Sequence, residues 1–168
     1  MSEVEIGGLG DFPVGVGHDD PDLLGDGRTV PGVLPGHGGA VAEHIAKGEA
    51  EGAKLLVDGR QARVDDRPNG YFVGPTVFDA VSPGMAIGRE EIFGPVASIC
   101  PVRTLDEAIA VMQAHPNANA TSIFTSSGRA AREFSKKASA SMVGVNIGVA
   151  APMAYFPFGG AKDSFFGD

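Results

Sequence analysis

Apolar side chains recur at helical spacing in three stretches of the chain. Gly52 is placed to end the first stretch and Pro116 the second, which opens with Thr104 and Glu107 in the arrangement of a capping box. A serine, at 126 or 127, can cap the third. The pattern predicts helices at about 41–51, 104–115 and 126–138. Their buried faces comprise Val41, His44 and Ile45; Leu105, Ala108, Ile109 and Met112; and Ala130, Ala131, Phe134 and Ala138.

Short apolar runs between these helices predict strands. The run at 96–102 (VASICPV) is nearly continuous, which is typical of a strand buried on both faces of a parallel sheet. The run at 71–78 is broken at Gly74-Pro75, so it indicates extended chain with an interruption. The predicted strands and extended segments are 54–57, 71–78, 96–102, 121–125 and 141–146.

The order strand, helix, strand, helix, strand after residue 96 indicates an α/β fold with parallel strands and right-handed crossovers. Residues 1–40 differ, because they hold eleven of the 25 glycines and show no periodicity. A backbone of that kind cannot easily offset the entropy lost on ordering. We therefore predict an irregular or disordered segment at 1–39 and a folded domain at 40–168.

Charge and composition exclude several classes of function. The formal net charge is −8 and the longest basic run is Lys136-Lys137, so binding to nucleic acid or to a membrane surface is not expected. The first residues show no secretory signal, and no apolar run approaches the length of a spanning helix. The single cysteine, Cys100, fits a reducing compartment, and we expect a cytoplasmic protein.

Isolated chemical motifs are weak. Gly15-Val-Gly17 and Gly36-His-Gly38 lack the strand and third glycine of a dinucleotide loop, and His18-Asp19-Asp20 lacks converging metal ligands. Cys100 lies inside an apolar run, where a thiol behaves as a small hydrophobic group, so core packing is favoured over nucleophilic catalysis. We therefore predict no catalytic residue and no metal site from these motifs.

Residues 89–96 (REEIFGPV) are the most informative stretch. Two acids and an aromatic precede a predicted parallel strand, and ligands of doubly wound sheets bind where loops meet strand ends. A carboxylate there can accept hydrogen bonds from both ribose hydroxyls, and an aromatic ring can wall off a planar heterocycle. The residues themselves leave this interpretation level with a simple surface turn.

The same stretch, with GPTVF at 74–78 and the element Phe158-Gly-Gly160, resembles the signature of the aldehyde dehydrogenase superfamily. NANAT at 117–121, MVGVN at 142–146 and SFFGD at 164–168 are similar to its methylmalonate-semialdehyde branch. The resemblance covers about 40–168 and implies a C-terminal part of the catalytic domain of such an enzyme. Ala118 and Ala120 stand where the family usually has glycines, and residues 147–151 replace a proline-rich segment.

The resemblance implies roles for three residues. Glu91 holds the nicotinamide ribose, Phe93 contacts the nicotinamide, and Phe158 lines the substrate tunnel. Asn146, near the same mouth, has a structural role at least as readily as a contact. The implied cofactors are NAD and CoA, the implied substrate is a small semialdehyde, and the implied assembly is a homo-oligomer.

The implied reaction begins with a cysteine thiolate attacking the aldehyde. Hydride then passes to NAD, CoA accepts the acyl group, and the carboxylate of a methylmalonyl-type substrate leaves as CO2. The resemblance places the nucleophile, the NAD loop and the oxyanion-stabilising asparagine N-terminal to these residues. We therefore expect a fragment that is inactive alone and associates through exposed apolar surface. The alternative is a non-catalytic α/β module that binds a partner or dehydrogenase subunits, and whether the chain is an enzyme stays open.

Overall fold

The computed structural model describes residues 5–7, 37–65, 72–148 and 150–165, and these form two compact units. One unit contains residues 16–101 and the other combines residues 1–15 with 102–168. The motifs at Gly15-Val-Gly17 and His18-Asp19-Asp20 lie outside the described residues, as does most of the segment 1–39. The predicted boundary at 39/40 therefore stays a prediction. None of the helices in the described ranges is long and apolar enough to cross a membrane.

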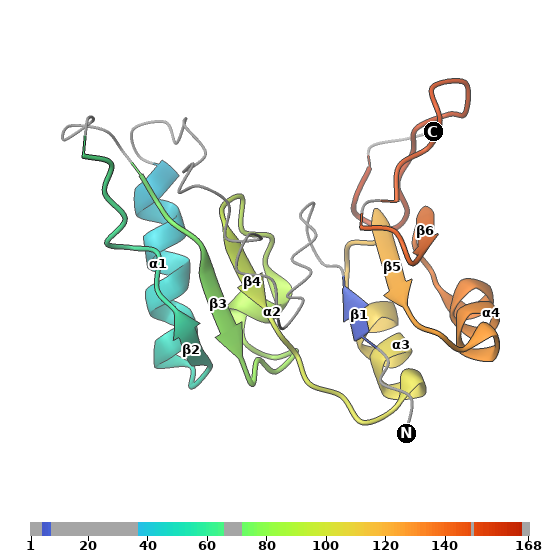
Figure 1. Ribbon diagram of the computed structural model, residues 1–168, viewed down its shortest axis with the longest axis horizontal. Helices are drawn as coiled ribbons and strands as arrows, with labels where there is room; N and C mark the ends of the chain where they lie inside the picture. Colours follow the sequence, from blue (N-terminus) through green and yellow to red (C-terminus); the bar gives the residue numbers. More distant parts are fainter. Residues whose placement is uncertain (1–4, 8–36, 66–71, 149, 166–168) are drawn as a thin grey trace. The chain divides into compact units, whose positions relative to one another are not determined.

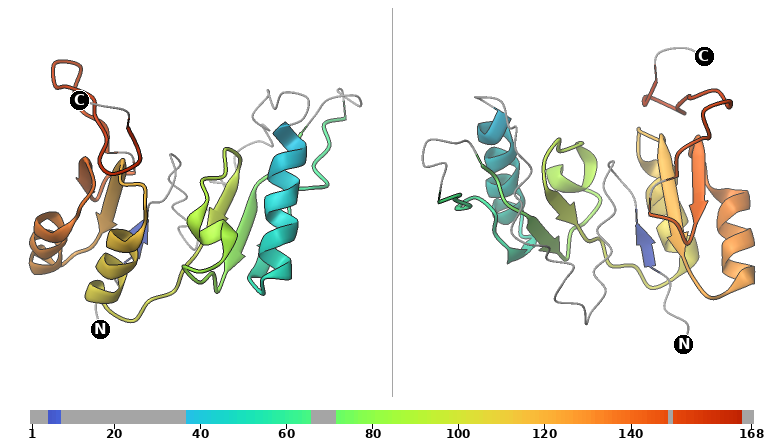
Figure 2. Two further views of the ribbon diagram at one scale, coloured as in Figure 1. Left: turned by 180° about the vertical axis from the view of Figure 1, so that it is seen from behind. Right: turned by 45° about the horizontal axis from the view of Figure 1, so that its top comes forward.

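The unit of residues 16–101 is a three-stranded sheet packed against two helices (Figure 1). In the sheet order β2-β3-β4, β2 pairs antiparallel with β3 and β3 pairs parallel with β4. Figures 1 and 2 show α1 running alongside this sheet. The elements are α1 (His37–Ala50), β2 (Lys54–Val57), β3 (Thr76–Asp79), α2 (Ala86–Arg89) and β4 (Val96–Ser98).

The core of this unit joins α1, α2 and β3. Val41 and Ile45 of α1 pack with Phe78 of β3 and Ile87 of α2, and the rings and branches are almost completely buried. Burying a side chain of the size of Phe78 contributes about 2 to 3 kcal/mol, so these contacts hold α1 to the sheet. Gly52, at φ 95°, ends the first helix as the sequence predicted, because a left-handed residue there costs glycine little.

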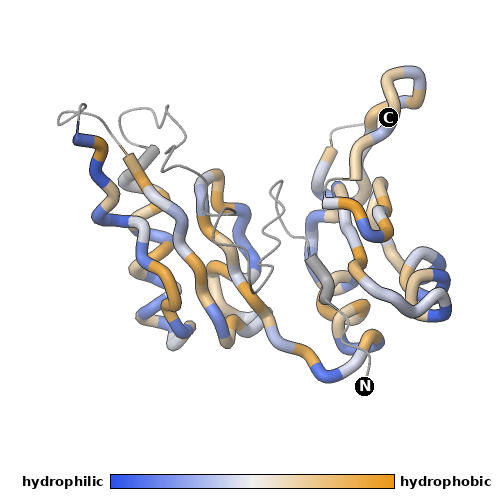
Figure 3. Tube along the Cα trace, viewed as in Figure 1, coloured by the Kyte–Doolittle hydropathy of each residue, from blue (hydrophilic) through white to orange (hydrophobic). Residues whose placement is uncertain are grey.

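The other unit also places two helices against a three-stranded sheet, ordered β1-β5-β6. β5 and β6 pair parallel and are connected in the sequence by α4, whereas β1 pairs antiparallel with β5. Ile123 and Phe134 are fully buried between β5, α3 and α4. In Figure 3 hydrophilic shades mark the outer turns of α4. The elements are β1 (Glu5–Gly7), α3 (Leu105–Ala114), β5 (Ala120–Phe124), α4 (Gly128–Lys137) and β6 (Met142–Val145).

The predicted helix caps are present, with one difference in geometry. The Thr104 hydroxyl accepts a hydrogen bond from the Glu107 amide at 3.1 Å, and Ser127 caps α4 in the same way through Ala130. The Glu107 carboxylate reaches back one residue further than a capping box requires, to the amide of Arg103 at 2.8 Å. The side chains of Thr104 and Glu107 therefore accept hydrogen bonds from two backbone amides at the start of α3.

The α/β class with parallel strands is confirmed, but two details of the prediction are wrong. The run 96–102 forms only a three-residue strand at the end of its sheet, and Ile99 and Val102 are exposed. β4 and β5 belong to different sheets, so α3 does not join parallel neighbours, whereas α4 does join β5 to β6. An apolar run indicates that a segment packs against some apolar surface, but it does not determine which strands pair.

Candidate functional site

The loop that carries Glu91 and Phe93 connects α2 to β4 and is held by its own backbone. The Gly94 amide donates to the Ile92 carbonyl and the Val96 amide donates to the Gly94 carbonyl, both at 2.8 Å. The Pro95 carbonyl accepts from the Thr76 amide of β3, also at 2.8 Å. These tight turns present the side chains at 91 and 93 outward, next to the start of α1.

Gly94 allows this loop to lie directly on α1. A Cβ atom at position 94 would come within 2.7 Å of a Val41 methyl group, closer than carbon atoms approach in folded proteins. Val41 is only 3% exposed and cannot swing aside. The glycine of the GPV motif is therefore required by close packing.

A pocket of about 200 Å³ lies between this loop and α1. Its lining combines apolar groups with one carboxylate and one imidazole: Ala40, Val41, His44, Glu91, Ile92 and Phe93. The Phe93 side chain is 68% exposed, which is unusual for a large apolar residue and leaves its ring available to a ligand. Among the residues that the structure describes, Glu91 makes no hydrogen bond or ion pair, so its oxygens are available as acceptors.

The neighbouring glutamate behaves differently. Glu90 turns toward α1, where one carboxylate oxygen lies 3.2 Å from His44 Nε2 and the other lies 3.5 Å from Lys47 Nζ. The hydrogen bond with His44 and the positive charge of Lys47 hold the pKa of the Glu90 carboxyl below its usual range. Glu90 thus belongs to an ion-pair cluster with α1, whereas Glu91 lies beside the pocket with no such partner in the described ranges.

Phe158 lies in the other unit, on the loop after β6, and is 59% exposed. The end of that loop is tied to the body of the unit. The Lys162 ammonium donates to the carbonyls of Gln113 and His115 at the end of α3, at 2.6 and 2.8 Å, where a cation is favourable. The Ala118 amide donates to the Ser164 hydroxyl at 2.7 Å, and the Ser141 hydroxyl donates to the carbonyl at Gly159. The aromatic ring is therefore displayed on a loop whose base is fixed.

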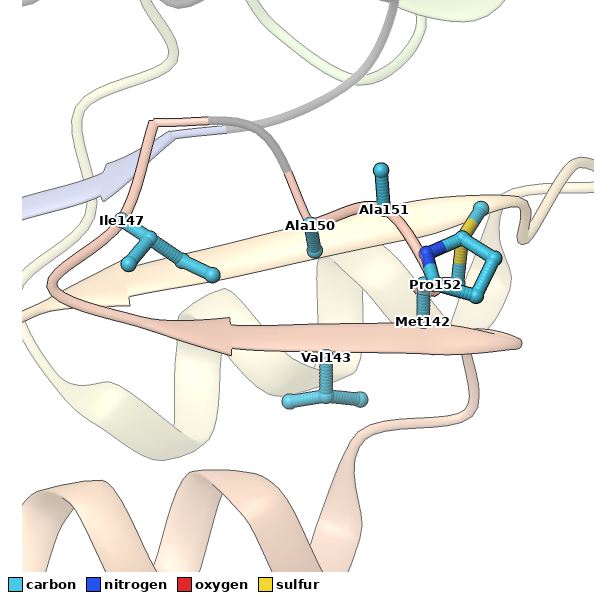
Figure 4. A pocket seen from close by; sticks show the side chains of 6 residues that line it. All are labelled: Met142, Val143, Ile147, Ala150, Ala151 and Pro152. Carbon is cyan, nitrogen blue, oxygen red and sulfur yellow. The ribbon is translucent and has the colours of Figure 1, made fainter. Parts of the chain in front are cut away.

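A second pocket, of about 210 Å³, lies between β6 and the loop that follows it. Figure 4 shows Ala150, Ala151 and Pro152 over one side of β6, whereas Val143 points from the opposite face. All the lining side chains are apolar, so this pocket offers no group for acid–base or nucleophilic chemistry. The lining is completed by Met142 and Ile147.

Asn146 closes β6 in a structural manner. Its amide donates to the Thr125 carbonyl at 3.1 Å and its carbonyl accepts from the Thr125 amide at 2.8 Å. The residue has φ 56°, a conformation that asparagine tolerates better than most residues. Both polar groups of the side chain are thus occupied by backbone, which favours the structural alternative for Asn146.

Cys100 is partly buried just beyond β4. Burial raises the pKa of its thiol, which disfavours the thiolate form needed by a nucleophile. The interpretation of this cysteine as a packing residue stays a prediction. His44 was assigned only to a helix face, and its place in the pocket had no signal in the sequence because its partner lies 46 residues away.

Comparisons with known proteins agree on one family. The model of the aldehyde dehydrogenase family matches residues 28–168. Malonate-semialdehyde dehydrogenases 1 and 2 of Geobacillus kaustophilus are 46% identical over 89% of this chain and 45% identical over all of it. The matches cover 30% and 34% of those enzymes, so the chain spans about a third of the length of these curated relatives.

Solved structures give the same result. A methylmalonate-semialdehyde dehydrogenase from Sinorhizobium meliloti complexed with NAD is 41% identical, with a TM-score of 0.79 over 82% of this chain and 28% of that one. An aldehyde dehydrogenase from Mycobacterium tuberculosis complexed with NAD+ is 36% identical, with a TM-score of 0.72 over 80% of this chain and 27% of that one.

Proposed function

This chain belongs to the aldehyde dehydrogenase family, and on that premise we propose that it is part of an NAD-dependent, CoA-acylating (methyl)malonate-semialdehyde dehydrogenase. The observation that carries the proposal is the pocket in which the unpaired carboxylate of Glu91 lies beside the exposed ring of Phe93. An acceptor pair next to a flat apolar surface suits a ribose joined to a planar heterocycle. The names of the relatives support the choice of semialdehyde.

In this proposal each candidate residue has one task. Glu91 accepts hydrogen bonds from the hydroxyls of the nicotinamide ribose, and Phe93 packs against the nicotinamide. Phe158 forms part of the wall of the substrate tunnel. These residues bind and orient, and none of them forms a covalent bond.

Catalysis requires further groups. In this proposal the nucleophilic thiol is a residue other than Cys100, because burial of Cys100 disfavours its thiolate. We propose that residues outside these 168 supply the nucleophile, the rest of the NAD site and the oxyanion donor, and that CoA accepts the acyl group. We also propose that the working assembly is a homo-oligomer, as the family resemblance implies. We propose that it is cytoplasmic, since the single cysteine fits a reducing compartment.

The experiment is a chimera. Residues 28–168 replace the matched part of Geobacillus kaustophilus malonate-semialdehyde dehydrogenase 1, with that enzyme's own sequence kept on both sides. NADH formation is followed with malonate semialdehyde, with and without CoA, and the acyl-CoA product is identified by mass spectrometry. We expect CoA-dependent turnover by the chimera and none by the 168-residue chain alone. A folded chimera that forms no NADH contradicts the proposal.

Glu91→Gln tests the assigned role within the chimera. It removes the charge from the hydrogen bonds to the ribose, so the KM for NAD should rise roughly 10- to 100-fold. Glu43→Gln is the matched control, because Glu43 is an exposed glutamate of α1 outside the pocket lining. An unchanged KM in Glu91→Gln would remove this residue from the site.

A second candidate function is favoured by a different observation. Four large apolar side chains on the loop after β6 are more than half exposed: Met153, Tyr155, Phe156 and Phe158. The Tyr155 and Phe156 rings contact each other in a tilted arrangement, with their centroids 4.8 Å apart. Such a surface suits a non-catalytic module that binds dehydrogenase subunits. An inactive chimera, together with co-purification of the 168-residue chain and an intact dehydrogenase from Geobacillus kaustophilus, would favour this function.

A further inference from the structure

His44 makes two contacts that are both hydrogen bonds only if each of its two ring nitrogens donates a proton. Nδ1 lies 2.8 Å from the Ala40 carbonyl oxygen and Nε2 lies 3.2 Å from a Glu90 carboxylate oxygen. A carbonyl and an ionised carboxylate can only accept hydrogen bonds. A neutral imidazole has one N–H, so it can satisfy one of these contacts, whereas an imidazolium satisfies both.

The Glu90 end of this arrangement lies immediately before the pocket residues. Glu90 follows the last residue of α2, and its own amide donates to the Ala86 carbonyl at 2.8 Å, so the backbone is held on the α2 side. On the other side, Glu91 and Phe93 project toward the pocket that His44 also lines. The side chain of Glu90 is therefore the polar link between the pocket loop and α1.

We infer that His44 and Glu90 are positioning residues that clasp the loop of Glu91 and Phe93 to α1, and that the clasp is complete only when His44 is protonated. Histidine is the side chain that ordinarily changes charge between about pH 5 and 8. Loss of the His44 proton removes one of the two hydrogen bonds and the charge attraction to Glu90. The loop is then held to α1 only by the longer contact between Lys47 and Glu90, at 3.5 Å, and by the packing of Gly94 on Val41. The nicotinamide-facing part of this inference rests on the proposed function.

The charged groups around His44 are consistent with this assignment. Glu90 faces it directly from the loop after α2, and Glu91 faces it across the pocket. Lys47 lies one turn further along α1 and shares the Glu90 carboxylate. Lys47 therefore still contacts Glu90 when the imidazole of His44 is neutral.

The test uses the 168-residue chain and no cofactor. The chain contains no tryptophan, so Phe93→Trp introduces a unique fluorescent reporter on the loop. Its emission maximum and anisotropy are recorded between about pH 5 and 8. We expect one transition in this background, loss of that transition with His44→Gln added, and its retention with the matched histidine control His115→Gln, which lies in the other unit.

Two further variants keep the test decisive. Lys47→Gln should retain the transition, because it leaves both His44 and Glu90 in place. Glu90→Gln should reduce its amplitude, because the charged acceptor is removed, and this variant carries the test if His44→Gln fails to fold by circular dichroism. Absence of a transition in the reporter chain, or its persistence in both His44→Gln and Glu90→Gln, overturns the inference.

Failure of the clasp and failure of the proposed function are distinguishable. An inactive chimera leaves the reporter experiment untouched, because that experiment needs no NAD. In an active chimera, the KM for NAD should rise between about pH 6 and 8, and this rise should be lost in His44→Gln. The value of kcat should depend on pH in the same way in both proteins. A KM that is independent of pH in both proteins contradicts the clasp alone.

Discussion

Replacement of Gly94 by alanine measures how closely the pocket loop lies on α1. The added Cβ would meet the two methyl groups of Val41 at 2.7 and 3.0 Å, both short of ordinary contact, and Val41 is buried against Ile45 and Phe78. Overpacking of this kind costs about 1 to 3 kcal/mol, of which reduced entropy of the unfolded chain offsets about 0.5 kcal/mol. We therefore expect Gly94→Ala to lower the free energy of unfolding by about 0.5 to 2.5 kcal/mol.

Val41→Ala separates the steric term from any other effect of the alanine. Alone, it removes two methyl groups from the core and should cost about 2 kcal/mol. In the double variant both clashing methyl groups are gone, and the remaining Val41 Cβ lies 3.5 Å from the new atom, which is ordinary contact. The double variant should therefore be at least as stable as Val41→Ala alone, with a coupling free energy of about 1 to 3 kcal/mol.

The assay is urea unfolding of the full chain followed by circular dichroism. Gly39→Ala, in the first turn of α1, is the control because a Cβ there meets nothing within 4 Å. That control should be neutral or slightly stabilising. Wild-type stability of Gly94→Ala, or strict additivity of the two substitutions, would refute the close approach on which the shape of the pocket depends.

Three further results are expected. Thr104→Ala removes the side-chain cap of α3 and should cost about 0.5 to 2 kcal/mol by urea unfolding, with Thr104→Ser as the variant that restores it. Asn146→Ala should destabilise more than Asn146→Gly by about 1 kcal/mol, because both lose the bonds to Thr125 but only glycine accepts the left-handed backbone without strain. The backbone amide of Arg103, as hydrogen-bond donor, lowers the pKa of the Glu107 carboxyl, so its stabilisation is present above the usual glutamate range and is lost as pH falls. The Tm should consequently fall less steeply between about pH 5 and 3 in Glu107→Gln than in the wild type, and equal slopes would contradict this assignment.

The local elements could be predicted because their causes lie within a few residues of each other. The capping of α3 by Thr104, the end of α1 at Gly52 and the buried stripe through Ile109 and Met112 all follow from neighbouring side chains. The pairing of strands could not be predicted in the same way. β4 and β5 follow one another in sequence but join different sheets, since that choice depends on which surfaces the rest of the chain leaves available.

The sequence by itself determined the family, the α/β class and the identity of Glu91, Phe93 and Phe158 as candidates, because the motif around residues 89–96 is local and specific. Only the tertiary structure decided what the two adjacent glutamates do. They are chemically identical, yet the backbone directs Glu90 to His44 and Lys47 on α1. It leaves Glu91 beside the pocket, with no hydrogen bond or ion pair among the residues that the structure describes. It also explained Gly94, since the Val41 side chain that excludes a Cβ lies more than 50 residues earlier and reaches it only through the fold.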